Sequence, residues 1–202
     1  MRKIPGLAVA ALLLVAVPPL ASAQVRVTVL VGATGSSSLV NDEVIETIEV
    51  TPGLAPTFLL GASLPISPKV RASLELGYGS SSVEITGGSG LTEDFGTLGT
   101  FTAALGLVGP IVSRLDWRLS LGVLQYFPSE DTGIFADGVP AAAVFGAGLD
   151  WRQPLSERWT GVIGARYDFH LFTTPALESA GFSGSQQVSR VGLAVGAAWV
   201  YQ

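Results

Sequence analysis

Apolar and polar residues alternate along much of the chain with a period of two. In residues 158–172, Trp159 and Ile163 share one parity with most of the large apolar residues, whereas Arg166 and Asp168 share the other. Successive side chains of a β-strand point to opposite faces of a sheet. The pattern therefore predicts a strand with one apolar face and one small or charged face.

The same alternation recurs in eight segments. They are residues 25–35, 57–66, 70–84, 95–108, 114–127, 139–152, 158–172 and 187–201. The connections after the second, fourth and sixth segments are tight, at 67–69, 109–113 and 153–156, whereas those after the odd segments are longer and polar, the first spanning about 36–54. An even number of strands with alternately short and long connections predicts an all-β fold, a single antiparallel up-and-down transmembrane β-barrel.

The first residues predict a cleavable signal peptide. A short basic start precedes an uncharged apolar run at 7–17, and a small-x-small pattern ends at Ala23. The run is too short to cross a bilayer as a helix, which needs roughly 20 residues. We expect cleavage between Ala23 and Gln24, which leaves residues 24–202 as one barrel domain. The alternative is an uncleaved anchor formed by the same segment.

The composition favours a barrel in a membrane over a soluble protein. The chain is 48% hydrophobic and only 13% charged, with a mean hydropathy of +0.50, whereas average soluble domains carry about 25% charged residues. Beyond the leader, no unbroken apolar stretch is long enough for a membrane helix. The net charge of -5 disfavours nucleic-acid binding, and the absence of cysteine excludes disulfides.

Aromatic and charged residues are sorted between the two ends of the predicted strands. Four tryptophans lie on the apolar parity at the tight-turn ends: Trp117, Trp151, Trp159 and Trp199. Six further aromatics lie toward the opposite ends: Phe58, Tyr78, Phe95, Phe127, Phe169 and Phe172. Two aromatic girdles around an apolar band are typical of membrane barrels. Acidic residues gather in the long loops, whereas basic residues lie near the tight turns or on the interior parity.

This combination of leader, alternating strands, turn rhythm and girdles resembles the small outer-membrane β-barrel proteins, such as the OmpA transmembrane domain and the OmpX and OmpW families. The resemblance covers residues 25–201 and identifies no subfamily. It implies export through the inner membrane, a barrel surrounded by outer-membrane lipid, and the barrel assembly machinery as a partner during biogenesis. Such proteins usually end in an aromatic residue, whereas this chain ends in Gln202.

Most of the charged side chains of the predicted strands occupy the alternate positions that would face the barrel interior. These are Arg26, Arg71, Glu75, Asp116, Arg118, Asp150, Arg152, Arg166, Asp168 and Arg190. An eight-stranded barrel is just wide enough for side chains to fill it, and buried charges need partners. We therefore expect a structural network that plugs the lumen, in a protein with a structural or surface-interaction role whose surface partner the sequence does not identify. The alternative is a narrow pore for water, ions or small solutes.

Two further hypotheses are less favoured. A secreted, lipocalin-like carrier would need an apolar interior and a polar exterior, the reverse of the pattern in residues 158–172. A lipid A-modifying enzyme would need a serine beside a histidine base, but His170, the one histidine, is followed two residues later by Phe172 and has inward parity. The sequence predicts no enzyme, cofactor or metal site.

Overall fold

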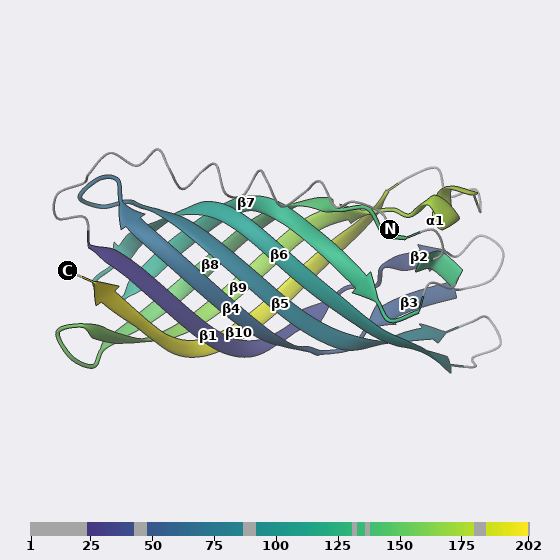
Figure 1. Cartoon of the computed structure of the whole chain (residues 1–202), viewed down its shortest axis with the longest axis horizontal. Coiled ribbons are helices and arrows are strands. Elements are labelled where there is room, and N and C mark those ends of the chain that lie inside the picture. Colours follow the sequence, from purple (N-terminus) through teal and green to yellow (C-terminus); the bar gives the residue numbers. More distant parts are fainter. Residues whose placement is uncertain are drawn as a thin grey trace, which may run out of the picture.

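Eight long antiparallel strands close into a barrel in the computed structural model (Figure 1). The structure describes residues 24–42, 48–86, 92–130, 133–135, 138–179 and 185–201. The predicted signal peptide, residues 1–23, lies outside them. The eight strands are β1 (Val25–Ser36), β4 (Ala55–Pro65), β5 (Arg71–Thr86), β6 (Thr92–Val112), β7 (Leu115–Pro128), β8 (Ala142–Pro154), β9 (Trp159–Phe172) and β10 (Gln186–Tyr201).

The barrel closes without a crossover. Each long strand pairs with its neighbours in the order β5-β4-β1-β10-β9-β8-β7-β6, and β6 pairs back with β5. The first and last strands form the closing seam, whose register runs from Val25 opposite Tyr201 to Ser36 opposite Arg190. The predicted fold class, an antiparallel eight-stranded barrel, is confirmed.

The two ends of the barrel differ, as the connection lengths predicted. The tight turns and the C-terminus lie at one end, here named the turn end, and the longer connections with the short helix α1 (Pro175–Ser179) lie at the other, the loop end (Figure 1). Among the described residues, none of the helices is long and apolar enough to cross a membrane.

The connection predicted over residues 36–54 is not all loop. It contains two short strands, β2 (Val40–Asp42) and β3 (Ile48–Pro52), and β3 pairs with the outer part of β5. The loop prediction was wrong here because the segment extends the barrel wall through pairing with a distant strand, which local alternation does not reveal. A 3-10 turn, η2 (Gly133–Phe135), lies in the connection between β7 and β8.

The prediction of a turn at 109–113 was also wrong in extent. Strand β6 continues through Pro110, which lies opposite Asp116, and the register shifts between Pro110 and Val112. Proline is tolerated in a sheet at a bulge near a strand end. The connection therefore shrinks to residues 113–114.

Candidate functional site

The outer wall of the barrel is apolar. Alternate residues of every long strand carry large hydrophobic side chains that are 40% or more exposed, among them Val31, Leu60, Leu74, Leu105, Leu121, Phe145, Ile163 and Leu193. Water-soluble proteins rarely expose a continuous apolar surface of this kind. A hydrocarbon surrounding is the environment in which such a wall is stable, and the reverse arrangement of a soluble carrier is absent from the described strands.

The predicted girdle tryptophans lie on this wall near the turn end. Trp151 and Trp159 are 41% and 50% exposed, whereas Trp199 is half-buried and stacks edge-on against Tyr201. Trp117 covers Gly109 of the neighbouring strand so closely that a Cβ there would meet the indole ring at 2.8 Å. The glycine therefore makes room for the ring.

The aromatic residues predicted for the loop-end girdle do not all lie on the outer wall. Phe58, Tyr78 and Phe127 lie on the wall, with 46 to 54% of each residue exposed. Phe172 is only 2% exposed and belongs to the interior, so its assignment to the girdle was wrong. Its even parity in β9 points it inward, like His170 two residues earlier. Phe169 is half-buried. The side chain of Phe95 lies outside the described part of the chain.

Four charged side chains meet at mid-barrel inside the lumen, and we name them the central quartet. Glu75 of β5 lies 3.4 Å from a guanidinium nitrogen of Arg118 and 3.3 Å from one of Arg166. Asp150 of β8 lies 3.1 Å from Arg118 and 2.6 Å from Arg166. Each carboxylate thus contacts both arginines, and the formal charge of the quartet is zero. Pairing offsets the cost of burying these charges.

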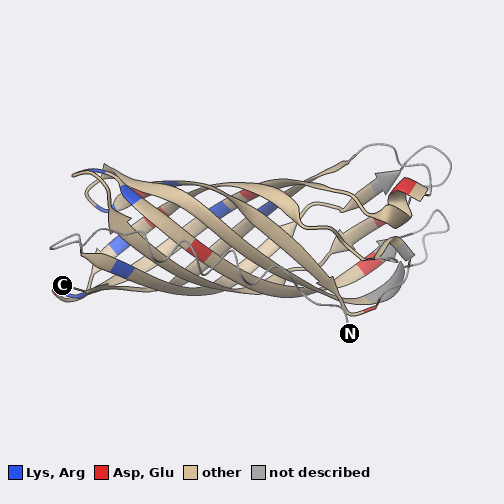
Figure 2. Cartoon of the chain, turned by 45° about the horizontal axis from the view of Figure 1, so that its top comes forward, with Lys and Arg blue, Asp and Glu red and all other residues tan. Residues whose placement is uncertain are grey.

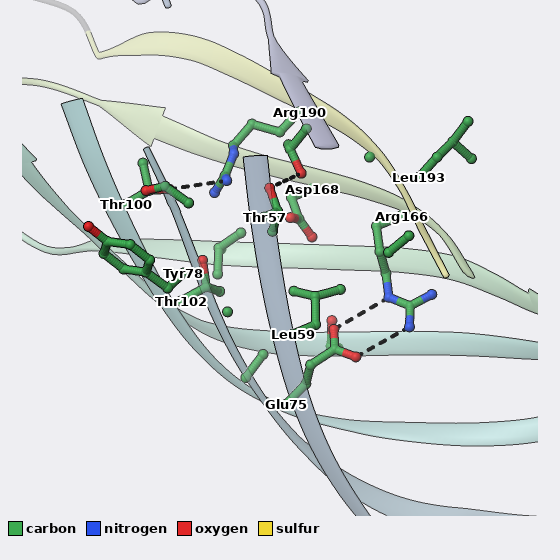
Figure 3. A pocket seen from close by; sticks show the side chains of 18 residues that line it. Thr57, Leu59, Glu75, Tyr78, Thr100, Thr102, Arg166, Asp168, Arg190 and Leu193 are labelled. Atoms are coloured by element: carbon green, nitrogen blue, oxygen red, sulfur yellow. Dashed lines mark hydrogen bonds and ion pairs between the residues drawn. The ribbon is translucent and has the colours of Figure 1, made fainter. Parts of the chain in front are cut away.

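The contact between Glu75 and Arg166 crosses the barrel (Figure 3). Three strands separate β5 from β9 in either direction around the barrel, so the two residues come from opposite sides. A cavity of about 40 Å³ lies beside them, lined partly by Thr102 and Asp168.

Two more of the predicted lumen residues lie on the loop-end side of the quartet. Asp168 and Arg190 are opposite one another on β9 and β10, but no ion pair joins them among the described side chains. Instead Arg190 donates a hydrogen bond to the Thr100 hydroxyl at 3.4 Å (Figure 3). A second nitrogen of Arg190 is buried without a partner in the described part of the chain.

The remaining predicted lumen residues gather at the turn end. Arg152 donates to Asp116 at 2.6 Å. Arg71 donates to the Ser63 hydroxyl at 3.1 Å and, through Nη2, to the carbonyls of Ser63 and Gln24 at 2.8 and 2.7 Å. The structure thus divides the ten predicted residues into three levels, with a neutral centre and an excess of arginine at the turn end.

A buried apolar cluster at the loop end was missed by the sequence analysis; we name it the loop-end cluster. It comprises Leu39, Val40, Val50, Val83, Leu98, Leu124, Tyr126, Phe135, Val144, Phe172, Leu177 and Val188, all 3% exposed or less. Inward-facing residues of β7 to β10 contribute to it together with residues of β2, β3 and η2. The sequence does indicate this cluster. The inward-facing positions of β7 carry small and charged residues near the turn end but Leu124 and Tyr126 toward the loop end.

His170 lies in the wall of this cluster and is 1% exposed. Its Nε2 is 2.8 Å from the Tyr126 hydroxyl, and its Nδ1 has no hydrogen-bond partner among the described residues. No described serine hydrogen-bonds to it, so the serine that the enzyme hypothesis required beside the imidazole is not found among the described residues. Nor does the described part of the chain bring three His, Asp or Glu side chains together as metal ligands.

An apolar wall around a charged lumen defines the class of transmembrane β-barrels. No family model matches the chain, and neither does any curated protein sequence.

Solved structures do resemble it. The outer membrane protein AlkL, determined in DMPC bilayers, matches with a TM-score of 0.60 and 12% identity over 89% of this chain and 90% of that one. OprG from Pseudomonas aeruginosa matches with a TM-score of 0.57 and 14% identity over 89% and 97%. Neisserial surface protein A matches with a TM-score of 0.55 and 11% identity over 87% and 96%. The chain therefore has the fold of small outer-membrane barrels.

Proposed function

We propose that the protein spans the bacterial outer membrane as a barrel with a closed lumen, and that its role is structural or in surface interaction rather than in conduction. The observation that carries this proposal is the combination of an exposed apolar wall with a lumen occupied at two levels. The central quartet bridges opposite strands with contacts of 2.6 to 3.4 Å. The loop-end cluster fills the interior nearer the long connections.

Charge sorting supports an orientation with the loop end outside the cell. The exposed described residues of the loop end include Glu84, Glu130 and Glu178, whereas Lys69, Arg114 and Arg158 are exposed at the turn end together with Glu157. Figure 2 shows acidic residues at the loop end and mainly basic residues toward the turn end. Short turns on the periplasmic side and longer loops outside are the usual arrangement in bacterial barrels. The loop end is therefore the surface that would meet external partners.

Conductance tests the closed lumen. Protein refolded into planar bilayers is expected to give no regular unitary currents, because an ion would have to part the quartet and then cross the apolar cluster. Incorporation is verified by protease protection in vesicles of the same lipid. Reproducible unitary steps across independent preparations would overturn the closed-lumen proposal and favour the narrow pore.

Site-directed labelling tests location and orientation. Because the chain has no native cysteine, a thiol reagent labels only the introduced residue. Glu130→Cys at the loop end and Glu157→Cys in the turn between β8 and β9 are matched substitutions at exposed positions. A membrane-impermeant maleimide is expected to label Glu130→Cys in intact cells and Glu157→Cys only after the outer membrane is permeabilised. The opposite result would reverse the orientation, and recovery of the protein in a soluble fraction would refute the membrane location.

A further inference from the structure

The turn end of the lumen holds a pocket with an unbalanced charge. Its volume is about 210 Å³, and it lies beneath the connection between β4 and β5. Its charged lining comprises Arg26, Lys69, Arg71, Asp116 and Arg152. Four cationic side chains thus face one carboxylate, in contrast to the central quartet, where the charges cancel.

The pairing within the pocket leaves most of that positive charge uncompensated. Arg152 and Asp116 neutralise one another at 2.6 Å. Arg71 is fixed by the hydroxyl and carbonyl of Ser63 and the carbonyl of Gln24, all of them neutral acceptors. Lys69 lies on the exposed connection and makes no ion pair with any described carboxylate. The pocket therefore carries an excess of about three positive charges.

Arg26 is the most informative member of the set. It is the second residue of β1, where its backbone pairs with β4 and β10, but its side chain makes no hydrogen bond or ion pair with the described part of the chain. Its Nε is buried without a partner. A guanidinium without acceptors is unfavourable in a partly buried position. An acceptor from outside the chain would remove this cost.

We propose that this turn-end pocket binds a compact oxyanion of the phosphate class, supplied either as free phosphate or as the phosphate of a lipid headgroup. Guanidinium groups present planar pairs of donors that match phosphate oxygens, and an ammonium group adds a point charge. A phosphate dianion offsets more of the excess than a carboxylate can. The pocket volume is sufficient, since one water molecule occupies roughly 30 Å³ in the liquid.

Calorimetric titration with inorganic phosphate tests the site. The full-length mature barrel is refolded in a phosphate-free non-ionic detergent, so that neither lipid orientation nor conductance enters the measurement. Arg26→Gln is compared with Arg158→Gln, which removes the same charge from an exposed position at the same end of the barrel, outside the pocket lining. We expect Arg26→Gln to weaken phosphate binding by about tenfold or more, because it removes charge-assisted hydrogen bonds, and Arg158→Gln to leave it unchanged.

Absence of saturable binding to the native protein would overturn the proposal, as would equal weakening by both substitutions, which would indicate only a diffuse charge effect. Heat-modifiable migration in gels verifies that Arg26→Gln is folded. If it is not, Lys69→Gln serves in its place, because Lys69 is exposed and its side chain makes no described hydrogen bond or ion pair, the one described bond being from its backbone N–H to Ser67. A smaller but selective loss with Lys69→Gln supports the site, and no loss overturns it.

A second titration distinguishes the two sources of phosphate. A short-chain phosphatidic acid below its micelle concentration replaces inorganic phosphate in the same detergent. Tighter binding of the lipid, still dependent on Arg26, supports a headgroup as the occupant. Equal or weaker binding of the lipid supports the free ion. Failure of both titrations refutes the site while leaving the closed-lumen proposal untouched.

Discussion

The substitution Leu121→Arg tests whether the outer wall of the barrel contacts lipid or water. Leu121 is 55% exposed on β7, and its partners across the two ladders are Leu105 and Phe145, which are 61% and 59% exposed. It lies six residues from the first and seven from the last residue of β7 (Leu115–Pro128). This position is near the middle of the strand and therefore near the bilayer midplane.

The expected magnitude depends on the surrounding medium. In water, a substitution at an exposed position away from special contacts changes stability by about 0.5 kcal/mol or less. At the midplane of a bilayer, an outward-facing arginine on a barrel costs about 2–4 kcal/mol. No described acidic side chain shares the wall beside Leu121 to offset this cost. We therefore expect a loss in the range found for the midplane.

Leu155→Arg is the matched control. Leu155 is 65% exposed but lies in the turn between β8 and β9, beyond the apolar band. Equilibrium guanidinium unfolding in phosphatidylcholine vesicles, followed by tryptophan fluorescence, gives the free energy of unfolding of each variant. A loss for Leu121→Arg that is no larger than the loss for Leu155→Arg would refute the assignment of this wall to hydrocarbon.

Three further predictions use the same unfolding assay. Glu75→Gln leaves two buried arginines with one carboxylate, so we expect a loss of about 3–5 kcal/mol, against little change for the exposed Glu84→Gln on the same strand. Gly32→Ala should cost about 1–3 kcal/mol, because its Cβ would overlap the backbone carbonyl oxygen of Leu193 on β10, whereas Gly35→Ala has its nearest contact at 3.9 Å and should be tolerated. Tyr126→Phe removes the hydrogen bond to a buried histidine and should cost about 1–3 kcal/mol.

Each of these three predictions has a clear contrary outcome. Equal losses for the two glutamate substitutions would mean that the central quartet adds nothing specific to stability. Equal losses for the two glycine substitutions would mean that the closing seam does not require close approach. An unchanged free energy of unfolding for Tyr126→Phe would mean that water replaces the lost phenol group.

The division between wall and lumen was predictable because it depends only on the parity of residues along a strand. Ile163 and Arg166 differ in parity, and this alone separates lipid from lumen once the barrel closes. The choice of ion-pair partners was not predictable. Glu75 and Arg166 are 91 residues apart, and their meeting depends on the stagger of all the strands between them, which alternation leaves undetermined.

The loop end was the least predictable part for a related reason. Strands β2 and β3 pair over only a few residues, and their place is set by the outer extension of β5. The apolar cluster beneath them collects residues from segments far apart in the chain, such as Leu39, Leu124 and Val188. Sequence alternation predicts which face of the sheet each side chain occupies, but not which side chains it contacts.

The bridge between β5 and β9 has a consequence for assembly. Glu75 belongs to the first half of the chain and Arg166 to the second, so their attraction is gained only after both halves have come together. In an unclosed intermediate, Arg118 and Arg166 can still pair with Asp150 on the strand between them, but Glu75 lacks Arg166. A hydrocarbon interior penalises such an incompletely paired carboxylate heavily. We therefore expect closure of the barrel and its insertion into the bilayer to be coupled. The lumen charges make insertion of an open sheet unfavourable.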